Sequence, residues 1–270
     1  MSHLDIFLRR RIDALTGLIV LGLLLLIVRV VDLQWMQAER LQDLADKQRE
    51  RQYTGQAPRG PVLDVRGRVL AESIQVPSIA AVGRDVPKDR IAELAKALGL
   101  TESRVAARLK RSGFVWLARQ IDPAKAHAVA ELDIPGVREE TEWRRFNPLG
   151  PATGHLLGFV GMDGHGLEGL EHGLDDQLAG QDGRKHVQRD ARGHYLPGAR
   201  WLNEPKMGGR VQLYLDATLQ SMTYAALAES IEAQDAKGGS VVVMRPSDGA
   251  VLAMASWPGY NPNNYRNFRP

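Results

Sequence analysis

The pattern of hydrophobic and polar residues separates one long apolar run from a mixed remainder. Residues 14–28, ALTGLIVLGLLLLIV, contain no charged side chain, and Val30, Val31 and Leu33 extend the run past Arg29. At about 1.5 Å per residue, the roughly 20 positions of 14–33 match a hydrocarbon core about 30 Å thick. A core helix of a globular protein would show a polar face, which this run lacks before Arg29. The pattern predicts a single transmembrane helix over 14–33.

The charges on either side of the apolar run predict its orientation. Arg9, Arg10 and Arg11 precede it, whereas acidic and basic residues are mixed beyond it. Because basic residues are enriched on the cytoplasmic side of membrane helices, we expect residues 1–13 to be a cytoplasmic tail. A cleavable signal peptide would need small residues after the run, but VRVVDLQWM stands there. We therefore expect a retained single-pass anchor in a cell inner membrane, with the bulk of the chain in the periplasm.

Beyond the anchor, short helical and extended patterns alternate. Residues 33–52 carry a few apolar residues among many polar ones and indicate a solvated helical stalk, which glycines and prolines end within 53–61. Apolar residues at helical spacing predict helices over 86–98, 102–110 and 123–132, and strands are expected at 114–118 and after Gly136. Short helices and strands mixed in this way favour an α+β fold over a doubly wound sheet.

Residues 59–71, RGPVLDVRGRVLA, predict a β-hairpin whose turn is at Arg66 and Gly67. Gly67 can adopt the positive φ that such a turn needs. Asp64 is expected to accept hydrogen bonds from backbone amides of the turn. Arg59 is expected to pair with a carboxylate elsewhere in the domain.

Two chemical interpretations of the segment 164–172 are weak. His165 and His172, with neighbouring glutamates, could ligate zinc, but their spacing is not H-E-x-x-H. Gly164, Gly166 and Gly169 match G-x-G-x-x-G, yet a glutamate inside that loop would repel a pyrophosphate and no βαβ unit follows. We therefore expect neither a metal nor a cofactor.

A structural interpretation of the same segment fits better. Glycines permit close approach of backbone segments. Glu168 and Glu171 would then form buried or interfacial pairs with arginines, for which Arg59, Arg145 and Arg192 are candidates.

The carboxyl-terminal part begins a new unit near Arg210. Residues 211–216 alternate as a strand, and Asp216 can cap a helix over 217–233. Two further strands, 240–244 and 251–255, are joined by a tight turn.

Composition excludes some classes of function. The chain of 270 residues has no cysteine, which excludes disulfides, thiol nucleophiles and thiolate metal sites. Its net charge of +3 comes partly from the arginine cluster and gives no footprint of a nucleic-acid-binding protein.

Three segments of the chain resemble the sequence boxes of one family, the class B penicillin-binding proteins. RGPVLDVRGRVLA resembles R-G-x-I-x-D-R-x-G-x-x-L-A, and GLEGLEHGLDDQLAGQDG resembles G-x-E-G-x-E-x-x-x-[DE]-x-x-L-x-G-x-x-G. VQLYLDATLQ, followed by GGSVVVMRPSDGAVLAMASWPGYNPNNY, resembles the opening of a penicillin-binding transpeptidase domain. A further segment, RRFNPLGPATGHLLGFVG, resembles R-x-Y-P-x-G-x-x-x-x-H-x-x-G and departs from it at Phe146-Asn147. The other departures from the family patterns are at Val65, Tyr214, Met244 and Ala250.

The resemblance implies a domain order. After the transmembrane helix, it implies a stalk over 34–57, a non-catalytic mixed α/β pedestal of the dimerisation type over 58–200, and the incomplete start of a transpeptidase α/β domain over 201–270. It also implies a structural motif in the pedestal, made of Arg59, Gly60, Asp64, Gly67, Arg145, Gly166, Glu168, Gly169, Glu171 and Gly180.

The chemistry of this family is serine acyl transfer to peptidoglycan stem peptides, carried by S-x-x-K, S-x-N and K-[ST]-G motifs. None of the three occurs in the 270 residues, so we assign no catalytic residue and expect the chain as given to be inactive. The resemblance implies the amino-terminal portion of a division-type, septal peptidoglycan D,D-transpeptidase. The alternative is a non-catalytic, membrane-anchored divisome interaction protein, and a reading frame that continues past Pro270 would discriminate the two.

The resemblance also implies partners. These are the membrane, an FtsW-type glycosyltransferase and other divisome proteins, whereas stem peptides and β-lactams would bind only the full-length protein. No nucleic acid is expected.

Overall fold

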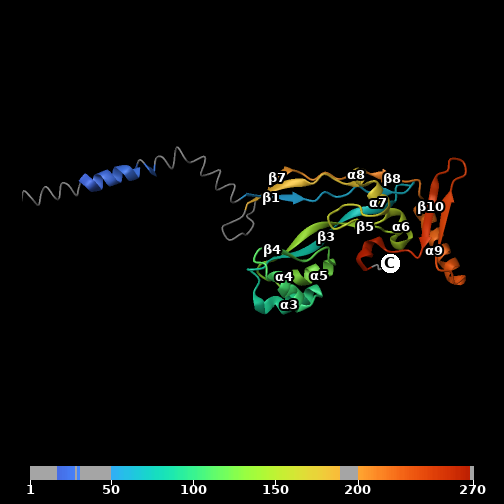
Figure 1. Cartoon of the computed structure of the whole chain (residues 1–270), viewed down its shortest axis with the longest axis horizontal. Coiled ribbons are helices and arrows are strands. Elements are labelled where there is room, and N and C mark those ends of the chain that lie inside the picture. The colour runs from blue at the N-terminus through green and yellow to red at the C-terminus, as the bar shows by residue number, and fades with distance from the viewer. Residues whose placement is uncertain (1–16, 28, 31–49, 189–199, 268–270) are drawn as a thin grey trace, which may run out of the picture. The chain divides into compact units, whose positions relative to one another are not determined.

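The computed structural model describes residues 17–27, 29–30, 50–188 and 200–267 of the chain. It divides into two compact units, one formed by Met1–Tyr53 and Lys185–Leu202, the other by Thr54–Arg184 and Asn203–Pro270. Figure 1 shows the elements of both units.

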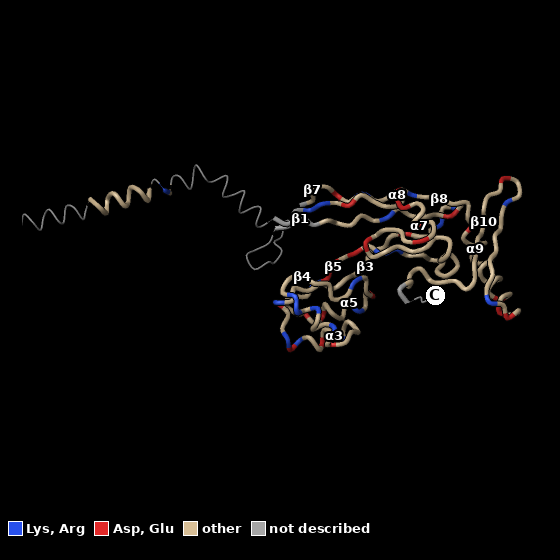
Figure 2. The backbone as a smooth tube through the Cα atoms, viewed as in Figure 1, with Lys and Arg blue, Asp and Glu red and all other residues tan. Residues whose placement is uncertain are grey.

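The first unit contains helical residues and a small sheet. Residues 17–27 and 29–30 are helical, and their aliphatic side chains are exposed. Figure 2 shows this helical stretch without a charged residue before Arg29. Among the described residues, which omit part of the predicted span 14–33, no helix has both the length and the apolar character to cross a membrane. Arg9, Arg10 and Arg11 lie outside the described residues.

The small sheet has three strands, β1 (Glu50–Gly55), β6 (Gly183–Gln188) and β7 (Arg200–Asn203), in the order β1-β6-β7. The predicted helical stalk is therefore wrong at residues 50–52. The neighbouring strand β6 supplies backbone hydrogen-bond partners to this stretch, and such pairing outweighs a weak local helical pattern. Residues 31–49 of the predicted stalk lie outside the described residues.

The second unit is built on one long strand, β3 (Val69–Val82). It pairs in antiparallel fashion with β2 (Val62–Leu63), β4 (Phe114–Ala118) and β5 (Val137–Phe146), and β2 pairs in parallel with β8 (Val211–Gln212). These strands form a five-stranded sheet. The hairpin predicted at 59–71 is confirmed, with Gly67 at φ 79°, but its second strand is much longer than the sequence pattern indicated.

Three helices gather beside β4 (Figure 1): α3 (Ile91–Leu98), which follows the 3₁₀ turn η2 (Lys88–Arg90), α4 (Glu102–Leu109) and α5 (Pro123–Ala130). Gly99 ends α3 in the left-handed conformation at φ 66°, and Asp122 caps α5 by accepting a hydrogen bond from the amide of Ala124. The apolar residues predicted for these helices form a core with Leu117 of β4. The three predicted helices are confirmed, although the first begins at Ile91 and not at 86.

Short helical elements follow β5: η3 (Gly150–Thr153), α6 (Gly154–Leu157), α7 (Gly169–Gly173) and α8 (Asp175–Leu178). A second core joins them to the hairpin and to the carboxyl-terminal elements. Its buried residues include Val62, Leu70, Leu157, Leu178 and Leu215. This core therefore holds together segments that are far apart in the sequence.

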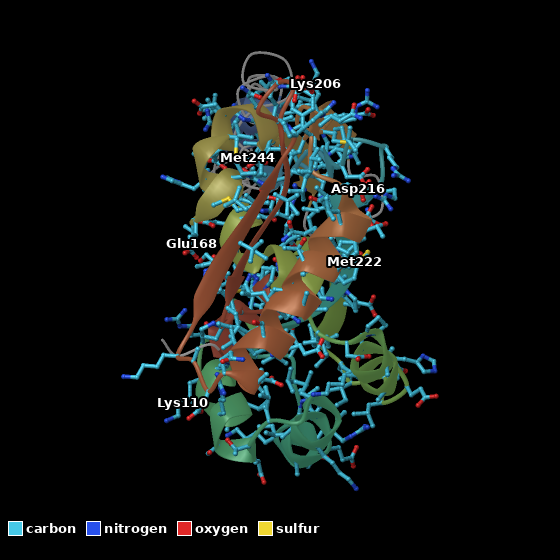
Figure 3. All side chains as sticks on the ribbon, turned by 90° about the vertical axis from the view of Figure 1, so that its right-hand side faces the viewer. Lys110, Glu168, Lys206, Asp216, Met222 and Met244 are labelled. Atoms are coloured by element: carbon cyan, nitrogen blue, oxygen red, sulfur yellow. The ribbon has the colours of Figure 1, made fainter. Side chains whose placement is uncertain are left out.

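The carboxyl-terminal elements are α9 (Ala217–Ala233), the antiparallel hairpin β9 (Gly239–Met244) and β10 (Val251–Trp257), and η4 (Pro262–Asn267). The fully buried side chain of Gln220 joins α9 to β10, because its amide nitrogen donates to the carbonyl of Met254 and its oxygen accepts from the amide of Met254, both at 2.8 Å. Met222 of α9 and Met244 of β9, labelled in Figure 3, have exposed side chains.

Candidate functional site

A buried ionic cluster connects the segment before β2 with β5 and α7. Arg59 donates from Nε to Oε2 of Glu171 at 3.0 Å, and Arg145 donates from Nε to Oε1 of the same carboxylate at 2.6 Å. The side chains of Arg59, Arg145 and Glu171 are 4%, 5% and 1% exposed. One buried carboxylate therefore bridges two buried guanidinium groups, an arrangement whose geometry fixes all three segments.

The two arginines also bind backbone carbonyls. Nη1 of Arg59 donates to the carbonyl of Gly164 at 2.9 Å, and Nη1 of Arg145 donates to the carbonyl of Gly60 at 2.9 Å. Burial lowers the pKa of Arg145, and the charge of Glu171 opposes this effect. The charge of Glu171 thus compensates in part for the burial of the Arg145 guanidinium.

Asp175 completes the cluster. Its Oδ1 accepts hydrogen bonds from Nη1 of Arg59 at 2.5 Å and from the amide of Gly166 at 2.9 Å. Burial would raise the pKa of Asp175, but the hydrogen bonds from Gly166 and Arg59 outweigh it and hold the pKa below its usual value. Sequence reasoning did not select Asp175. The available signal was the acidic position, [DE], which the box G-x-E-G-x-E-x-x-x-[DE]-x-x-L-x-G-x-x-G has at residue 175.

Four of the predicted glycines lie at close backbone approaches, whereas Gly67 has open space around it. A Cβ atom on Gly166 would come within 2.0 Å of the carbonyl oxygen of Glu171, a separation that no side chain tolerates. The same crowding applies to Gly60, Gly169 and Gly180. A larger residue at Gly166 would therefore displace the segment that carries Glu171.

A second cluster joins the hairpin to α9. The side chain of Asp64 is fully buried, and its Oδ1 accepts from the amides of Arg66 and Arg68, both at 2.8 Å. Its Oδ2 accepts from Nε of Arg68 at 2.7 Å and from the amide of Ala217, the first residue of α9, at 3.1 Å. Burial alone would raise the pKa of Asp64, but these donors together lower it.

Arg68 extends this cluster to the helix cap. Its Nη2 donates to Oδ1 of Asp216 at 2.8 Å, and the same oxygen caps α9 by accepting from the amides of Thr218 and Leu219. The hydrogen bond from the amide of Leu219 lowers the pKa of Asp216. Partial burial would raise this pKa, and the hydrogen bond from Arg68 lowers it further. Asp216, labelled in Figure 3, is thus confirmed as the cap, whereas sequence reasoning missed the bridging role of Arg68.

Glu168 does not take part in the arginine cluster. Its Oε2 accepts a hydrogen bond from the hydroxyl of Tyr260 at 2.8 Å, and its side chain is exposed. The predicted pairing of Glu168 with Arg59 or Arg145 is therefore not found among the described residues, and the backbone of Glu168 is extended just before α7. Burial, with a further contribution from Glu168, raises the pKa of Tyr260. Arg192, the other candidate partner, lies outside the described residues.

The histidines of this segment make separate contacts. Nδ1 of His165 lies 3.4 Å from Oδ2 of Asp175, and Nδ1 of His172 lies 3.1 Å from the carbonyl oxygen of Gly166. In the part of the chain that the structure describes, no three histidine, aspartate or glutamate side chains converge as metal ligands.

Acidic and basic residues are interspersed along the described backbone, as Figure 2 shows. In the first cluster they form buried pairs, and in the second the buried Asp64 pairs with the partly exposed Arg68. The arrangement can position segments rigidly relative to one another, and we assign no bond-making chemistry to it.

Comparison of the chain with known proteins identifies its relatives. A model of the penicillin-binding protein dimerisation domain matches residues 54–213. The chain is 36% identical over 258 residues to the probable peptidoglycan D,D-transpeptidase PbpC of Pseudomonas aeruginosa, covering 94% of this chain and 46% of the relative. It is 34% identical over 268 residues to the peptidoglycan D,D-transpeptidase FtsI of Escherichia coli, covering 96% and 45%. The chain therefore spans less than half the length of these relatives.

The fold resembles that of a solved structure, penicillin-binding protein 2X from Streptococcus thermophilus. The TM-score is 0.56 at 23% sequence identity, and the match covers 79% of this chain and 36% of that protein.

Proposed function

Since this chain belongs to the class B penicillin-binding protein family, we propose that it supplies the membrane anchor and the non-catalytic pedestal of a septal peptidoglycan D,D-transpeptidase. The names of its relatives, peptidoglycan D,D-transpeptidases, support the cross-linking activity, which we assign to the whole protein. The chain covers 45–46% of these relatives and lacks the S-x-x-K motif. The proposed role of its own residues is therefore to position the catalytic domain and to bind partner proteins.

The observation that carries this proposal is the set of hydrogen bonds made by Asp64. This one carboxylate accepts from the turn of the hairpin and from the first amide of α9. A pedestal that holds the first helix of a following module in this way can fix the orientation of that module relative to the pedestal.

We propose that residues 14–33 anchor the protein in the inner membrane, with residues 1–13 in the cytoplasm and the pedestal in the periplasm. The charge-free apolar run and the arginines before it support this topology. A reporter that is active only in the periplasm, fused after Gln52, should be active, whereas a cytoplasmic reporter at the same place should be silent. Activity of the cytoplasmic fusion would refute the topology.

The proposed partners are an FtsW-type glycosyltransferase and other divisome proteins, and a chimaera tests the septal role. The aligned segment of Escherichia coli FtsI is replaced by this chain in cells from which FtsI can be depleted. We expect the chimaera to lie at the septum and to restore division, and the same chimaera carrying Asp64→Ala to restore it poorly. A chimaera that is present in the membrane at normal amount, reacts with labelled penicillin and yet distributes along the lateral wall would refute the septal role.

A further inference from the structure

The stretch from α4 through β4 is basic without compensation in its own sequence. Residues 103–121 contain five lysine or arginine residues and neither aspartate nor glutamate. The whole chain has 35 basic and 32 acidic residues, so this stretch departs from the near balance of the rest. Figure 2 shows several basic positions beside the label β4. A surface of one sign attracts partners of the opposite sign.

Backbone contacts gather these basic residues at one end of the sheet. The amide of Gly83 donates to the carbonyl of Gly113 at 3.0 Å, and a Cβ atom on Gly83 would lie 2.0 Å from the carbonyl oxygen of Arg111. These contacts bring Arg84 beside the segment 110–113. We call the resulting surface the basic tip, and it consists of Arg84, Arg104, Arg108, Lys110, Arg111 and Phe114.

Most of the charge of the basic tip is available to a partner. Arg104, Lys110 and Arg111 are exposed and form no ion pair with any described residue. Arg108 donates to the carbonyl of Leu117, which leaves its charge without a carboxylate. Like charges one helical turn apart, as in Arg104 and Arg108, destabilise a helix. An anionic partner would relieve this repulsion.

An exposed aromatic ring lies within the basic tip. Phe114 is 38% exposed, and its ring meets that of Trp116 nearly at a right angle, with the centroids 5.1 Å apart. The guanidinium of Arg138, which also binds Glu140, lies 5.0 Å from the centroid of Phe114. An apolar ring among lysine and arginine is typical of surfaces that bind at a membrane interface. Because Arg138 covers one face of the ring, insertion among lipids is favoured over stacking on a sugar.

The basic tip lies at the end of the sheet that is remote from α9. Val82, the last residue of β3, pairs with Phe114, whereas Val69 at the other end belongs to the hairpin that Asp64 joins to α9. At about 3.3 Å per residue, the 14 residues of β3 separate these two ends by roughly 40 Å.

The chain enters the second unit nearer to the basic tip than to α9. This unit begins at Thr54, which lines a cavity together with Arg119, the residue after β4. Ala118, the last residue of β4, pairs with Ile79, only three residues before the end of β3 at the tip. The segment that leads from residues 14–33 into the pedestal therefore joins it on the side of the basic tip.

We propose that the basic tip binds the surface of an anionic phospholipid bilayer, with Phe114 inserted among the headgroups. The bilayer is the one that residues 14–33 are proposed to span, so this inference rests on the proposed membrane anchor. Basic side chains gain electrostatic attraction to anionic lipids, and burial of the exposed ring adds apolar contact. Such a contact would give the pedestal a second attachment to the membrane, in addition to the anchor.

Quenching of a fluorophore by spin-labelled lipid tests this contact in the full chain, reconstituted in vesicles. The chain has no cysteine, so Ser112→Cys in the exposed segment 110–113 takes up a single thiol-reactive fluorophore. The quencher is a phospholipid with a nitroxide near its headgroup, in vesicles of phosphatidylcholine alone or mixed with phosphatidylglycerol. We expect stronger quenching in the mixed vesicles, by about twofold or more, and loss of the difference at high salt. Ser247→Cys, exposed between β9 and β10, should be quenched equally in both.

Matched variants connect the quenching to the basic tip. Each basic residue near an anionic surface contributes about fivefold to binding, so Lys110→Gln combined with Arg111→Gln should weaken the contact about 25-fold. Lys206→Gln combined with Arg210→Gln removes the same two kinds of charge at other exposed positions and should leave quenching unchanged. Figure 3 shows Lys110 and Lys206 at opposite ends of the view. Phe114→Ser should reduce quenching in the mixed vesicles.

The outcomes distinguish failure of this inference from failure of the proposed anchor. Retention of the chain in the vesicles after alkaline carbonate treatment reports insertion of the anchor, whatever the fluorophore shows. An inserted chain with equal quenching of Ser112→Cys in both kinds of vesicle, or with quenching unchanged by loss of Lys110 and Arg111, would overturn the inference alone. If that chain instead binds soluble polygalacturonate, the partner of the basic tip is an acidic polysaccharide. Release of the chain by carbonate would contradict the anchor and, with it, this inference.

Discussion

Replacing Glu171 by glutamine should destabilise the protein strongly. The carboxylate is 1% exposed and binds both Arg59 and Arg145. In the variant, Arg59 retains Asp175, whereas Arg145 loses its only carboxylate among the described residues and remains buried. Removing one partner of a buried ion pair typically costs about 3–5 kcal/mol, because the remaining charge is desolvated without compensation. We expect a loss in this range, which corresponds to a fall in melting temperature on the order of 10 °C for a unit of this size.

The control is Glu93→Gln, which makes the same chemical change in an exposed pair. Glu93 is 54% exposed and binds Arg90 at 2.9 Å, so its removal should cost less than about 1 kcal/mol. Urea denaturation of the full chain in detergent, followed by tryptophan fluorescence, gives the free energy of unfolding of both variants, provided that the slope with urea is unchanged. If Glu171→Gln lies within about 1 kcal/mol of Glu93→Gln, the buried cluster does not stabilise the fold as argued.

Three further predictions concern other residues. The pKa of Asp64 is lowered in the folded state, so its ionised form stabilises the fold above about pH 4. This stabilisation is lost as the pH falls through the folded pKa. Between pH 7 and pH 3, the melting temperature should therefore fall less in Asp64→Asn than in the original chain. Tyr260→Phe should cost only about 1 kcal/mol in calorimetry, because the exposed Glu168 regains water, and a loss above about 3 kcal/mol would contradict this account. The chain as given should form no covalent adduct with labelled penicillin by intact mass, and a stoichiometric adduct on one serine would show that a nucleophile exists without S-x-x-K.

Local patterns predicted the elements whose stability is itself local. The helices at 102–109 and 123–130 show apolar residues at helical spacing, and the cap at Asp216 acts within three residues of its own position. The turn at Gly67 is likewise determined by its own backbone conformation. For such features the sequence window contains nearly all of the interacting groups.

Features that depend on distant partners were predicted less well. The sequence indicated only the first residues of β3, because Pro77 interrupts the strand pattern, although residues 72–81 of this strand pair with β5. Glu168 and Glu171 lie three residues apart, and nothing local indicates that one faces two arginines while the other faces Tyr260. Helix α7 begins at Gly169, between the two glutamates, so the backbone is extended at Glu168 and helical at Glu171.

Both ionic clusters include residues of the hairpin segment, and this explains how a non-catalytic segment can couple the position of α7 to that of α9. Arg59 connects it to α7, and Asp64, only five residues later, connects it to α9. Because both connections end on buried, multiply bonded charged groups, neither can shift without leaving a charge or a donor unpaired. A displacement of α7 must therefore move α9 with it or break one of the two clusters. The hairpin thus behaves as a rigid joint, and the rigidity resides in Asp64 and Glu171 more than in the few backbone hydrogen bonds of β2.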